Sequence, residues 1–432
     1  MVRELKHTEI GDIPVDWELQ TFDETFRVIS NNTLSRENLN NRGGAVRNIH
    51  YGDILTKFPE VLDCSEDEIP FVNDLSLLSS STQLLQDGDV VIADTAEDET
   101  VGKVTEVQNL GDSKLVAGLH TIPCRVKKGD FAPGWLGYYM NSDLFHNQIL
   151  PYITGIKVSS ISKGAISETL ILVPPFDEQE KIVQSLNKIQ LLMTAETKVV
   201  NKIKLVKNGC LSKMFPQKDD TVPEMRLPGF TEAWEQRKLG DIMDVTSVKR
   251  IHQSDWTDSG VRFLRARDIV AESKNEDVRE PLFISQEKYN EYSATSGKVK
   301  TGDLLVTGVG TIGVPMLINS EEPLYFKDGN IIWFKNENSI DGRFFYHSFN
   351  GYSIQKFIKE SAGTGTVGTY TIENGKKTPI NLPQQKEEQQ KIGSYFSNLD
   401  HLITLHQRKC DKYSNIKKGM MSDLLTGKIR LV

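Results

Sequence analysis

One short motif in the second half of the chain has the residue spacing of a nucleotide-binding site. Residues 308–313, Gly-Val-Gly-Thr-Ile-Gly, match G-x-G-x-x-G and follow a strand-like run at 304–307. A dinucleotide site also needs a helix whose N-terminus meets the pyrophosphate. Residues 314–318, Val-Pro-Met-Leu-Ile, read instead as a second strand. The motif therefore predicts a glycine-rich hairpin rather than a cofactor site.

Other catalytic motifs are missing from the sequence. It holds no Walker A sequence, no (Asn/Asp)-Pro-Pro-Tyr methyltransferase motif and no Gly-x-Ser-x-Gly elbow, and its eight histidines are scattered. The four cysteines, Cys64, Cys124, Cys210 and Cys410, lie far apart and form neither a zinc spacing nor a disulfide framework. We expect a non-catalytic chain that binds no cofactor or metal itself.

Basic, hydroxyl and glycine residues gather in loops of both halves. Arginine can read guanine edges bidentately, whereas lysine, threonine hydroxyls and glycine amides suit phosphates. Any one of these residues alone is more often an ordinary surface charge, but their recurrence at matching places favours DNA contacts. The candidates are Arg42, Arg47, His50, Tyr51, Lys57, Lys157, Ser159 and Lys163 in the first half, and Lys249, Arg250, Arg262, Arg265, Arg267, Thr364, Thr366 and Tyr370 in the second.

The loops belong to a chain that repeats itself. Glu-Gln-Glu-Lys-Ile at 178–182 returns as Glu-Gln-Gln-Lys-Ile at 388–392, an offset of 210 residues. Upstream the offset drifts, as between Trp17 and Trp234. Each half is therefore predicted to be a variable globular stretch followed by a rod of fixed length.

A 4-3-4-3 apolar spacing runs through each rod and predicts two long helices, the first from about 178 to 214 and the second at the same offset. A long amphipathic helix cannot bury its stripe alone, so we expect the rods to pair antiparallel. The predicted coiled-coil positions are Ile182, Leu186, Ile189, Met193, Ile203, Ile392, Phe396, Leu399, Ile403 and Leu424.

Polar residues occupy the same two slots in both rods, Glu196 with His406 and Lys207 with Lys417. We hypothesise that Glu196 and His406 face each other where the helices cross. The alternative is that both lie toward the flank of the helix pair and are solvated.

Short β-rich runs, turn signals and helical stretches such as 134–148 and 344–360 indicate that each globular half is an α+β domain. The chain has 432 residues and a net charge of −8, which argues mildly against indiscriminate nucleic-acid binding but leaves room for a local basic groove. It shows no leader-like segment and no run of about 18 apolar residues, so we expect a cytoplasmic protein.

The order domain, rod, domain, rod resembles the DNA-specificity subunit of type I restriction-modification systems. The residues that carry the resemblance are the two domain openings, 10–18 and 227–235, and the entry into the first rod, 174–182. The resemblance implies target-recognition domains at 1–176 and 230–383, spacer helices at 177–216 and 384–425, a linker at 217–229 and a C-terminal tail at 426–432.

The resemblance also implies a function. Each target-recognition domain would read one half of a bipartite, asymmetric site in double-stranded DNA. The paired helices would set the half-site spacing and dock two methyltransferase (M) subunits, which restriction (R) subunits would join. S-adenosylmethionine, ATP and Mg²⁺ would then be bound by partner subunits, which agrees with the missing catalytic motifs.

Two other readings of the sequence differ in what they predict. A non-enzymatic coiled-coil scaffold whose duplicated domains bind proteins would tolerate substitution of Arg47 or Arg265 with no change in DNA affinity. A nucleotide-binding protein would lose its ligand in a Gly310→Ala variant.

Overall fold

The computed structural model describes residues 4–155, 157–217, 220–274, 276–327, 329–363 and 368–431. The chain folds into two compact units. Unit 1 comprises Met1–Ala195 and Lys409–Val432, and unit 2 comprises Glu196–Arg408. The two long helices, α6 (Phe176–Met214) and α12 (Lys386–Leu424), cross this division, so each unit holds one half of each helix.

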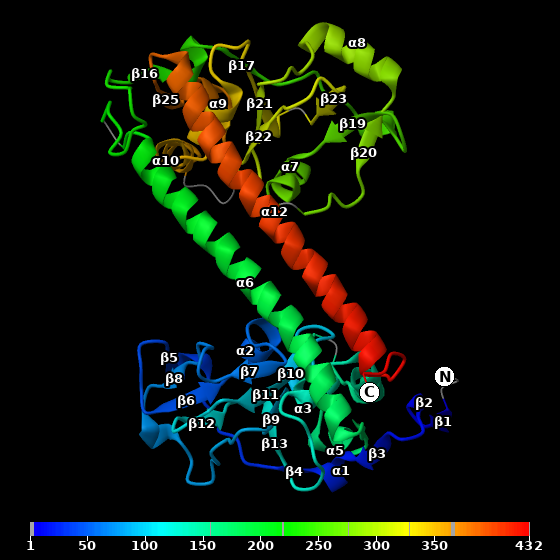
Figure 1. Ribbon diagram of the computed structural model, residues 1–432. Coiled ribbons are helices and arrows are strands. Elements are labelled where there is room, and N and C mark those ends of the chain that lie inside the picture. The colour runs from blue at the N-terminus through cyan, green and yellow to red at the C-terminus, as the bar shows by residue number, and fades with distance from the viewer. Residues whose placement is uncertain are drawn as a thin grey trace. The chain divides into compact units, whose positions relative to one another are not determined.

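The main sheet of unit 1 has five strands in the order β4-β13-β9-β11-β7, and β7 alone runs parallel to its neighbour (Figure 1). The central strand β9 is the sequence Val-Val-Ile-Ala and is buried throughout, as suits a strand covered on both faces. The strands are β4 Phe26–Val28, β7 Val61–Asp63, β9 Val90–Ala93, β11 Val104–Gln108 and β13 Thr121–Val126.

A second sheet of unit 1 has the order β12-β6-β8-β5, and three two-stranded ladders join β1 to β2, β3 to β15 and β10 to β14. These strands are β1 Leu5–Thr8, β2 Gly11–Pro14, β3 Glu18–Thr21, β5 Leu39–Asn40, β6 Val46–Ile49, β8 Phe71–Val72, β10 Thr95–Ala96, β12 Lys114–Ala117, β14 Ser159–Ser160 and β15 Leu170–Val173. The shorter helices are α1 Phe22–Thr25, α2 Tyr51–Thr56, α3 Trp135–Tyr139, α4 Asp143–Ile149 and α5 Lys163–Ser167, with 3₁₀ turns at Arg36–Asn38, Leu75–Leu77 and Leu150–Tyr152.

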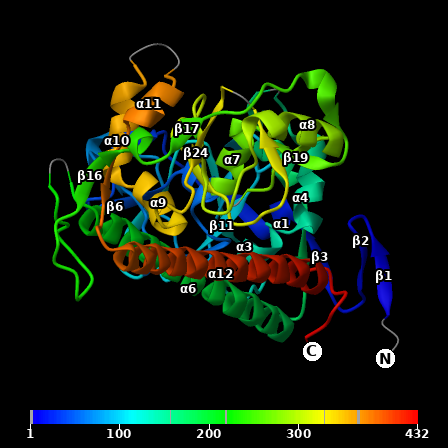
Figure 2. The same ribbon diagram turned by 90° about the horizontal axis from the view of Figure 1, so that it is seen from above.

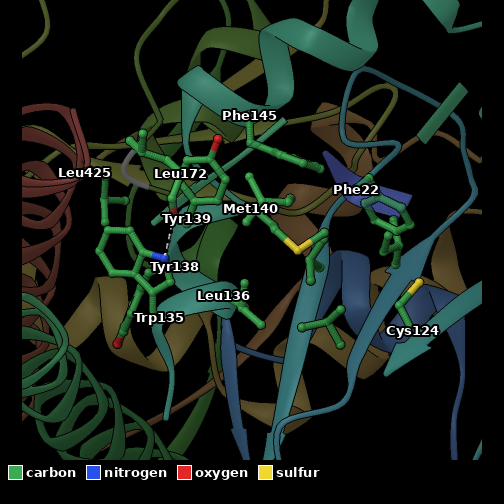
Figure 3. Close-up of a cluster of buried hydrophobic side chains, with 14 of the residues drawn as sticks. Phe22, Cys124, Trp135, Leu136, Tyr138, Tyr139, Met140, Phe145, Leu172 and Leu425 are labelled. Atoms are coloured by element: carbon green, nitrogen blue, oxygen red, sulfur yellow. Dashed lines mark hydrogen bonds between the residues drawn. The ribbon is translucent and has the colours of Figure 1, made fainter. Parts of the chain in front are cut away.

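The core of unit 1 is built around the aromatic face of α3 (Figure 3). Trp135 is fully buried, stacks on Tyr139 at 6.1 Å between ring centroids, and donates its indole N–H to the carbonyl of Leu172 at 3.2 Å. The same core holds Leu186 of α6 and Leu425, which directly follows α12. The long helices are therefore integral to the core of the unit.

Unit 2 repeats the plan. Its sheets have the orders β17-β24-β21-β22 and β18-β20-β19-β23, and a ladder joins β16 to β25. The strands are β16 Glu235–Lys238, β17 Asp244–Thr246, β18 Trp256–Thr257, β19 Val261–Leu264, β20 Leu282–Ile284, β21 Leu304–Thr307, β22 Pro315–Leu317, β23 Leu324–Phe326, β24 Ile331–Lys335 and β25 Pro379–Leu382. The helices are α7 Ala266–Ser273, α8 Gln286–Ser296, α9 Gly342–Phe349, α10 Tyr352–Ser361 and α11 Ile372–Lys377, with 3₁₀ turns at Leu239–Asp241 and Gln253–Asp255.

The two larger sheets of unit 1 correspond strand for strand to those of unit 2 except for β7, whereas the β1–β2 and β10–β14 ladders have no counterpart among the described strands of unit 2. The order β4-β13-β9-β11 matches β17-β24-β21-β22, and β12-β6-β8-β5 matches β23-β19-β20-β18. No strand among the described residues of unit 2 takes the place of β7, so β22 forms the edge of its sheet. The repeat read from the sequence is thus a repeat of topology.

Half of α6 packs antiparallel along half of α12 within each unit, and Figure 2 shows the two helices side by side. In unit 1, Lys417 Nζ donates to Gln190 Oε1 at 2.8 Å and pairs with Glu60 at 2.5 Å. In unit 2, Lys207 Nζ pairs with Asp400 at 2.5 Å. The predicted α+β fold with paired long helices is confirmed.

The hypothesis that Glu196 meets His406 is also confirmed. Nδ1 of His406 and Oε2 of Glu196 are hydrogen-bonded, and the two side chains are only 20 and 17% exposed. The solvated alternative is therefore wrong. Among the predicted coiled-coil positions, Ile182, Leu186, Ile392, Phe396 and Leu424 are buried, whereas Ile189, Met193, Ile203, Leu399 and Ile403 are half-buried.

Each long helix begins with a buried glutamate that is held by a tryptophan and an arginine. Glu178 of α6 accepts hydrogen bonds from Trp17 Nε1 at 2.9 Å and from Arg430 Nε and Nη2, both at 2.7 Å, and Arg430 also pairs with Asp16 at 2.6 Å. We call this set the Glu178 clamp. Glu388 of α12 is held in the same way, at 2.7 and 3.4 Å, by Arg226 and Trp234.

The glycine-rich motif at 308–313 forms a hairpin, as predicted. Strand β21 before it pairs antiparallel with β22 after it, and no helix follows directly. Both predicted helical stretches are split in two, because Ser142 caps α4 with its side chain and Gly351 precedes α10. Among the residues that the structure describes, no helix is long and apolar enough to cross a membrane, and no group of three or more histidine, cysteine, aspartate or glutamate side chains is placed to hold a metal ion.

Candidate nucleic-acid interface

The structure brings two separate candidate loops of unit 1 together. The ring of Tyr51 lies 4.7 Å from that of His50 and 5.2 Å from that of His120. His120 Nδ1 lies 3.2 Å from Thr95 Oγ1, and Thr95 pairs with Ser160 between β10 and β14. We name these five residues the unit 1 loop cluster. It joins the loop that begins α2 to the loop at 154–163.

His120 sits at the exposed side of this cluster. Its backbone adopts a left-handed φ of 55°, which few non-glycine residues adopt and which ends the preceding turn before β13. Its Nδ1 lies 3.4 Å from Asp94 Oδ1, and the side chains of His120 and Asp94 are 45 and 26% exposed. With Nδ1 directed at the Asp94 carboxylate and Thr95 hydroxyl, Nε2 is the nitrogen left to accept from, or donate to, an incoming group.

His50 has a structural function in the cluster. It is the N-cap of α2, and its Nδ1 accepts a hydrogen bond from the Gly52 amide at 3.1 Å. Burial lowers the pKa of His50, and the nearby Arg36 guanidinium lowers it further. Arg36 in turn pairs with the buried Asp53 at 2.7 Å. His50 is therefore a neutral cap that supports Tyr51, with only 7% of its surface exposed.

The other candidates of unit 1 divide into exposed and anchored residues. Arg47 on β6 donates to the Cys64 carbonyl at 2.6 Å, and Lys57 donates to the Glu68 carbonyl at 2.6 Å. Ser159 pairs with Ala96 in the ladder of β10 and β14. Exposed side chains at the same loops are Arg42, Lys157 and Lys163.

Unit 2 presents the corresponding loops. The Tyr370 amide donates to the Gly308 carbonyl at 2.9 Å, as the Ile161 amide donates to the Asp94 carbonyl at 2.9 Å, so the loops that the sequence pairs as equivalents do occupy equivalent positions. Tyr370 itself is 2% exposed and bonded to Thr378, so its side chain belongs to the core rather than to a contact surface. Two further candidates lie outside the described residues: Thr364 and Thr366.

The arginines of unit 2 are held in different ways. Arg265 caps α7, grips the buried Asp268 with two hydrogen bonds at 3.0 Å and donates to the Glu280 carbonyl at 2.8 Å, which makes it an anchor. Arg267 is 61% exposed and has carboxylates no nearer than 3.8 Å, among the contacts between described residues. Arg262 on β19 is turned inward, with its guanidinium 5.9 Å from the ring of Phe283. Arg267 is thus the arginine best placed to meet a partner.

Lys249 and Arg250 lie in the loop after β17. The Lys249 ammonium lies 4.3 Å from the centroid of the Tyr292 ring, a cation–π contact, and its amide donates to Ser296 Oγ at 2.7 Å. Both side chains are exposed. They therefore remain available for phosphate contacts.

Sequence reasoning missed Asp94, Thr95, His120 and Arg36. Asp94, Thr95 and His120 lie well outside the basic stretches that pointed to the site, whereas Arg36 lies just six residues before Arg42. A histidine with a left-handed backbone leaves no mark in a sequence. Asp94 and Thr95 do have side chains that can form hydrogen bonds, but the stretch around them reads in the sequence as merely acidic.

Comparisons with known proteins show which proteins this chain is similar to. A profile of the type I restriction modification DNA specificity domain matches residues 231–412. The chain is 23% identical over 451 residues to the putative type I restriction enzyme MjaX specificity subunit of Methanocaldococcus jannaschii, covering 99% of this chain and 96% of that protein. It is 28% identical over 293 residues to the MjaVIII specificity subunit of the same organism, covering 64% of this chain and 66% of that one.

The fold resembles a solved structure along the whole chain. The crystal structure of the S subunit of a type I restriction-modification system from M. genitalium matches with a TM-score of 0.58 and 14% identity, covering 98% of this chain and 99% of that one. At this identity the likeness concerns the fold.

Proposed function

We propose that this chain, which belongs to the family of type I restriction-modification DNA-specificity subunits, selects the DNA sequence on which its complex acts. The subunit is not itself an enzyme. Its two target-recognition domains each read one half of a bipartite, asymmetric DNA site. The chemistry would belong to partner subunits that carry S-adenosylmethionine, ATP and Mg²⁺.

The observation that carries the proposal is the repeat of one fold with different loops. Both units place the start of a short helix, α5 or α11, at the same position after the sheet, and matching backbone bonds from Ile161 to Asp94 and from Tyr370 to Gly308 hold it there. The residues at that position differ, with a histidine and tyrosine cluster in unit 1 and the glycine-rich hairpin at 308–313 in unit 2. Equal scaffolds with unequal contact residues suit two half-sites of different sequence.

We further propose that the paired helices set the half-site spacing and dock two M subunits, with R subunits joining that core. Large apolar side chains remain exposed on both helices although the positions of their seam are buried or half-buried, and such exposed stripes are typical of helix docking. In unit 1 these are Leu191, Leu192 and Ile416, and in unit 2 they are Val199, Leu205, Val206, Leu402 and Leu405. The complex would act in the cytoplasm.

A methylome comparison tests the proposal. Genomic DNA is mapped for methylated bases in host cells with this chain and without it, while the methyltransferase partner is expressed in both. We expect one bipartite motif, two short specific blocks around a fixed gap, to disappear when the chain is removed. An unchanged methylome with both proteins present would refute the specificity function.

A domain exchange separates the two recognition domains. Replacement of 230–383 with the equivalent domain of a relative should change one half-site and leave the other half-site and the spacing unchanged. A change in both half-sites would contradict independent reading by the two units.

A further inference from the structure

The main sheet of unit 2 has four described strands, one fewer than the main sheet of unit 1. In unit 1, β7 covers the edge of β11 through parallel pairing, in which the Glu106 amide donates to the Glu60 carbonyl at 2.9 Å and the Gln108 carbonyl accepts from the Cys64 amide at 2.8 Å. In unit 2, β22 takes the place of β11 and pairs with β21 alone among the described strands.

The backbone bonds fix which residues correspond at this edge. The Val107 carbonyl accepts from the Gly88 amide, and the Val107 amide donates to the Asp89 carbonyl, both at 2.8 Å. In unit 2 the Ile318 carbonyl accepts from the Gly302 amide at 2.8 Å, and the Ile318 amide donates to the Asp303 carbonyl at 2.9 Å. The edge positions that β7 engages in unit 1, Glu106 and Gln108, therefore correspond to Leu317 and Asn319.

The difference arises from the length of one connection. Between α2 and β8 the chain has residues 57–70, which contain β7. Between α7 and the equivalent strand β20 it has only residues 274–281. The shorter connection gives unit 2 less chain with which to form the extra strand.

A cavity of about 710 Å³ lies at this edge, wholly within unit 2. Helices α7 and α9 pack against β22 beside it (Figure 1). Its lining includes Leu317 and Asn319 at the strand edge, together with the buried apolar side chains of Leu264, Ile269 and Ile318. In unit 1 the comparable space is filled by β7, whose Leu62 is fully buried in a core.

Two buried nitrogen atoms of the cavity lining lack hydrogen-bond partners among the described residues, Nδ1 of His347 and Nη1 of Arg262. His347 is 1% exposed, and its Nδ1 lies 3.9 Å from the Asp400 carboxylate, beyond hydrogen-bond distance. The Glu272 carboxylate of the same lining interacts electrostatically with Arg262 but accepts no hydrogen bond from its Nη1, and buried polar groups are rarely left unsatisfied in native proteins. Both point to a ligand with hydrogen-bonding groups.

We propose that this cavity receives an extended segment of a partner subunit, which adds a strand parallel to β22. The segment would pair its main chain with Leu317 and Asn319, place an apolar side chain where unit 1 has Leu62, and direct a hydrogen-bond acceptor at Nη1 of Arg262. The chain itself shows a suitable pattern, Glu60-Val61-Leu62-Asp63, in unit 1. This surface goes beyond DNA reading, and its occupancy does not depend on which sequence is read.

Photo-crosslinking in the assembled complex tests the proposal. A photoreactive residue replaces Asn319 in the full chain, which is co-expressed with its methyltransferase and restriction partners. The matched control places the same residue at Gln108, whose edge β7 already covers. We expect a crosslink to a partner subunit from position 319, at least tenfold stronger than from position 108.

Two additions make the result decisive. A synthetic peptide of residues 57–65 with Cys64→Ser, added in excess, should reduce the crosslink from position 319 at least fivefold, and an Arg262→Met chain should show a similar reduction. Retention of the bipartite methylation motif in the crosslinking variant shows that the complex is assembled and keeps the test separate from the proposed DNA function. No crosslink from position 319 in such a complex, equal crosslinks from both positions, or a crosslink indifferent to both peptide and Arg262→Met would overturn the proposal.

Discussion

Removal of the glutamate from the Glu178 clamp should destabilise unit 1 selectively. The Glu178 side chain is 2% exposed and accepts hydrogen bonds from Trp17, from Arg430 and from the amide of Leu431. In Glu178→Ala the indole N–H loses its carboxylate acceptor, and Arg430, 18% exposed, keeps Asp16 as its one carboxylate partner among the described residues. Loss of one partner from a buried ion pair costs about 3–5 kcal/mol.

That cost can be measured unit by unit. Hydrogen exchange followed by mass spectrometry reports the opening free energy of separate segments. Peptides from β9, β13 and α3 should exchange more than about 100-fold faster in the variant, because about 1.4 kcal/mol corresponds to a factor of ten in an equilibrium constant. Peptides from β21 and β24 of unit 2 should keep their rates.

Two controls bracket the experiment. Glu180→Ala removes an exposed carboxylate from the same turn of α6 and should change exchange by less than about threefold, as expected for a surface site. Glu388→Ala removes the equivalent glutamate of α12 and should accelerate exchange in unit 2 instead. If Glu178→Ala left unit 1 within about 1 kcal/mol of wild type, or loosened both units equally, the reasoning from the clamp would be refuted.

Three further predictions follow from the structure. Burial raises the pKa of Glu106 to about 7, so protonation of Glu106 favours the folded state. The stability of unit 1 should therefore fall as the pH rises from about 4.5 through 7. In Glu106→Gln, hydrogen-exchange measurements across this range should show no such dependence of stability on pH. Leu186→Ala should lower the stability of unit 1 by about 2–5 kcal/mol, because it leaves a cavity in the helix seam. Leu191 is exposed, so Leu191→Ala should leave stability unchanged and weaken M-subunit binding in a pull-down. Unaltered binding would contradict the docking proposal. His120→Ala should reduce the discrimination between bases at one position of the half-site read by unit 1. Arg42→Ala should instead weaken DNA binding evenly across sequences and reduce the slope of log affinity against log salt concentration by about one unit. Titrations on a panel of half-site variants at several salt concentrations distinguish the two effects, and a uniform loss of affinity in both variants would assign His120 to backbone contact.

Local patterns were enough to predict the long helices and the repeat. A helix buries its stripe through contacts that recur every three to four residues, so Ile182, Leu186, Ile392 and Phe396 reveal both helices without knowledge of the fold. The equal spacing of the two rods likewise predicted that Glu196 meets His406, because equivalent positions of two antiparallel helices face each other only at the midpoints, where these two residues lie. The hairpin at 308–313 followed from residues that directly adjoin it. The domain boundaries remain a prediction, because the division between the two compact units falls within both long helices.

The loop cluster and the open sheet edge required the tertiary structure. Tyr51, Thr95, His120 and Ser160 come from four distant segments, and their meeting depends on strand order and on one left-handed residue, neither of which a local pattern encodes. The inward turn of Arg262 and the anchoring of Arg265 could not be distinguished from surface charge for the same reason. Residues alone determine what a segment can form. The long-range contacts of a segment depend on the length of the connections and on the packing around it, so only the folded chain decides them. Examples are the pairing of β7 with β11 in unit 1 and the lack of an equivalent strand among the described residues of unit 2.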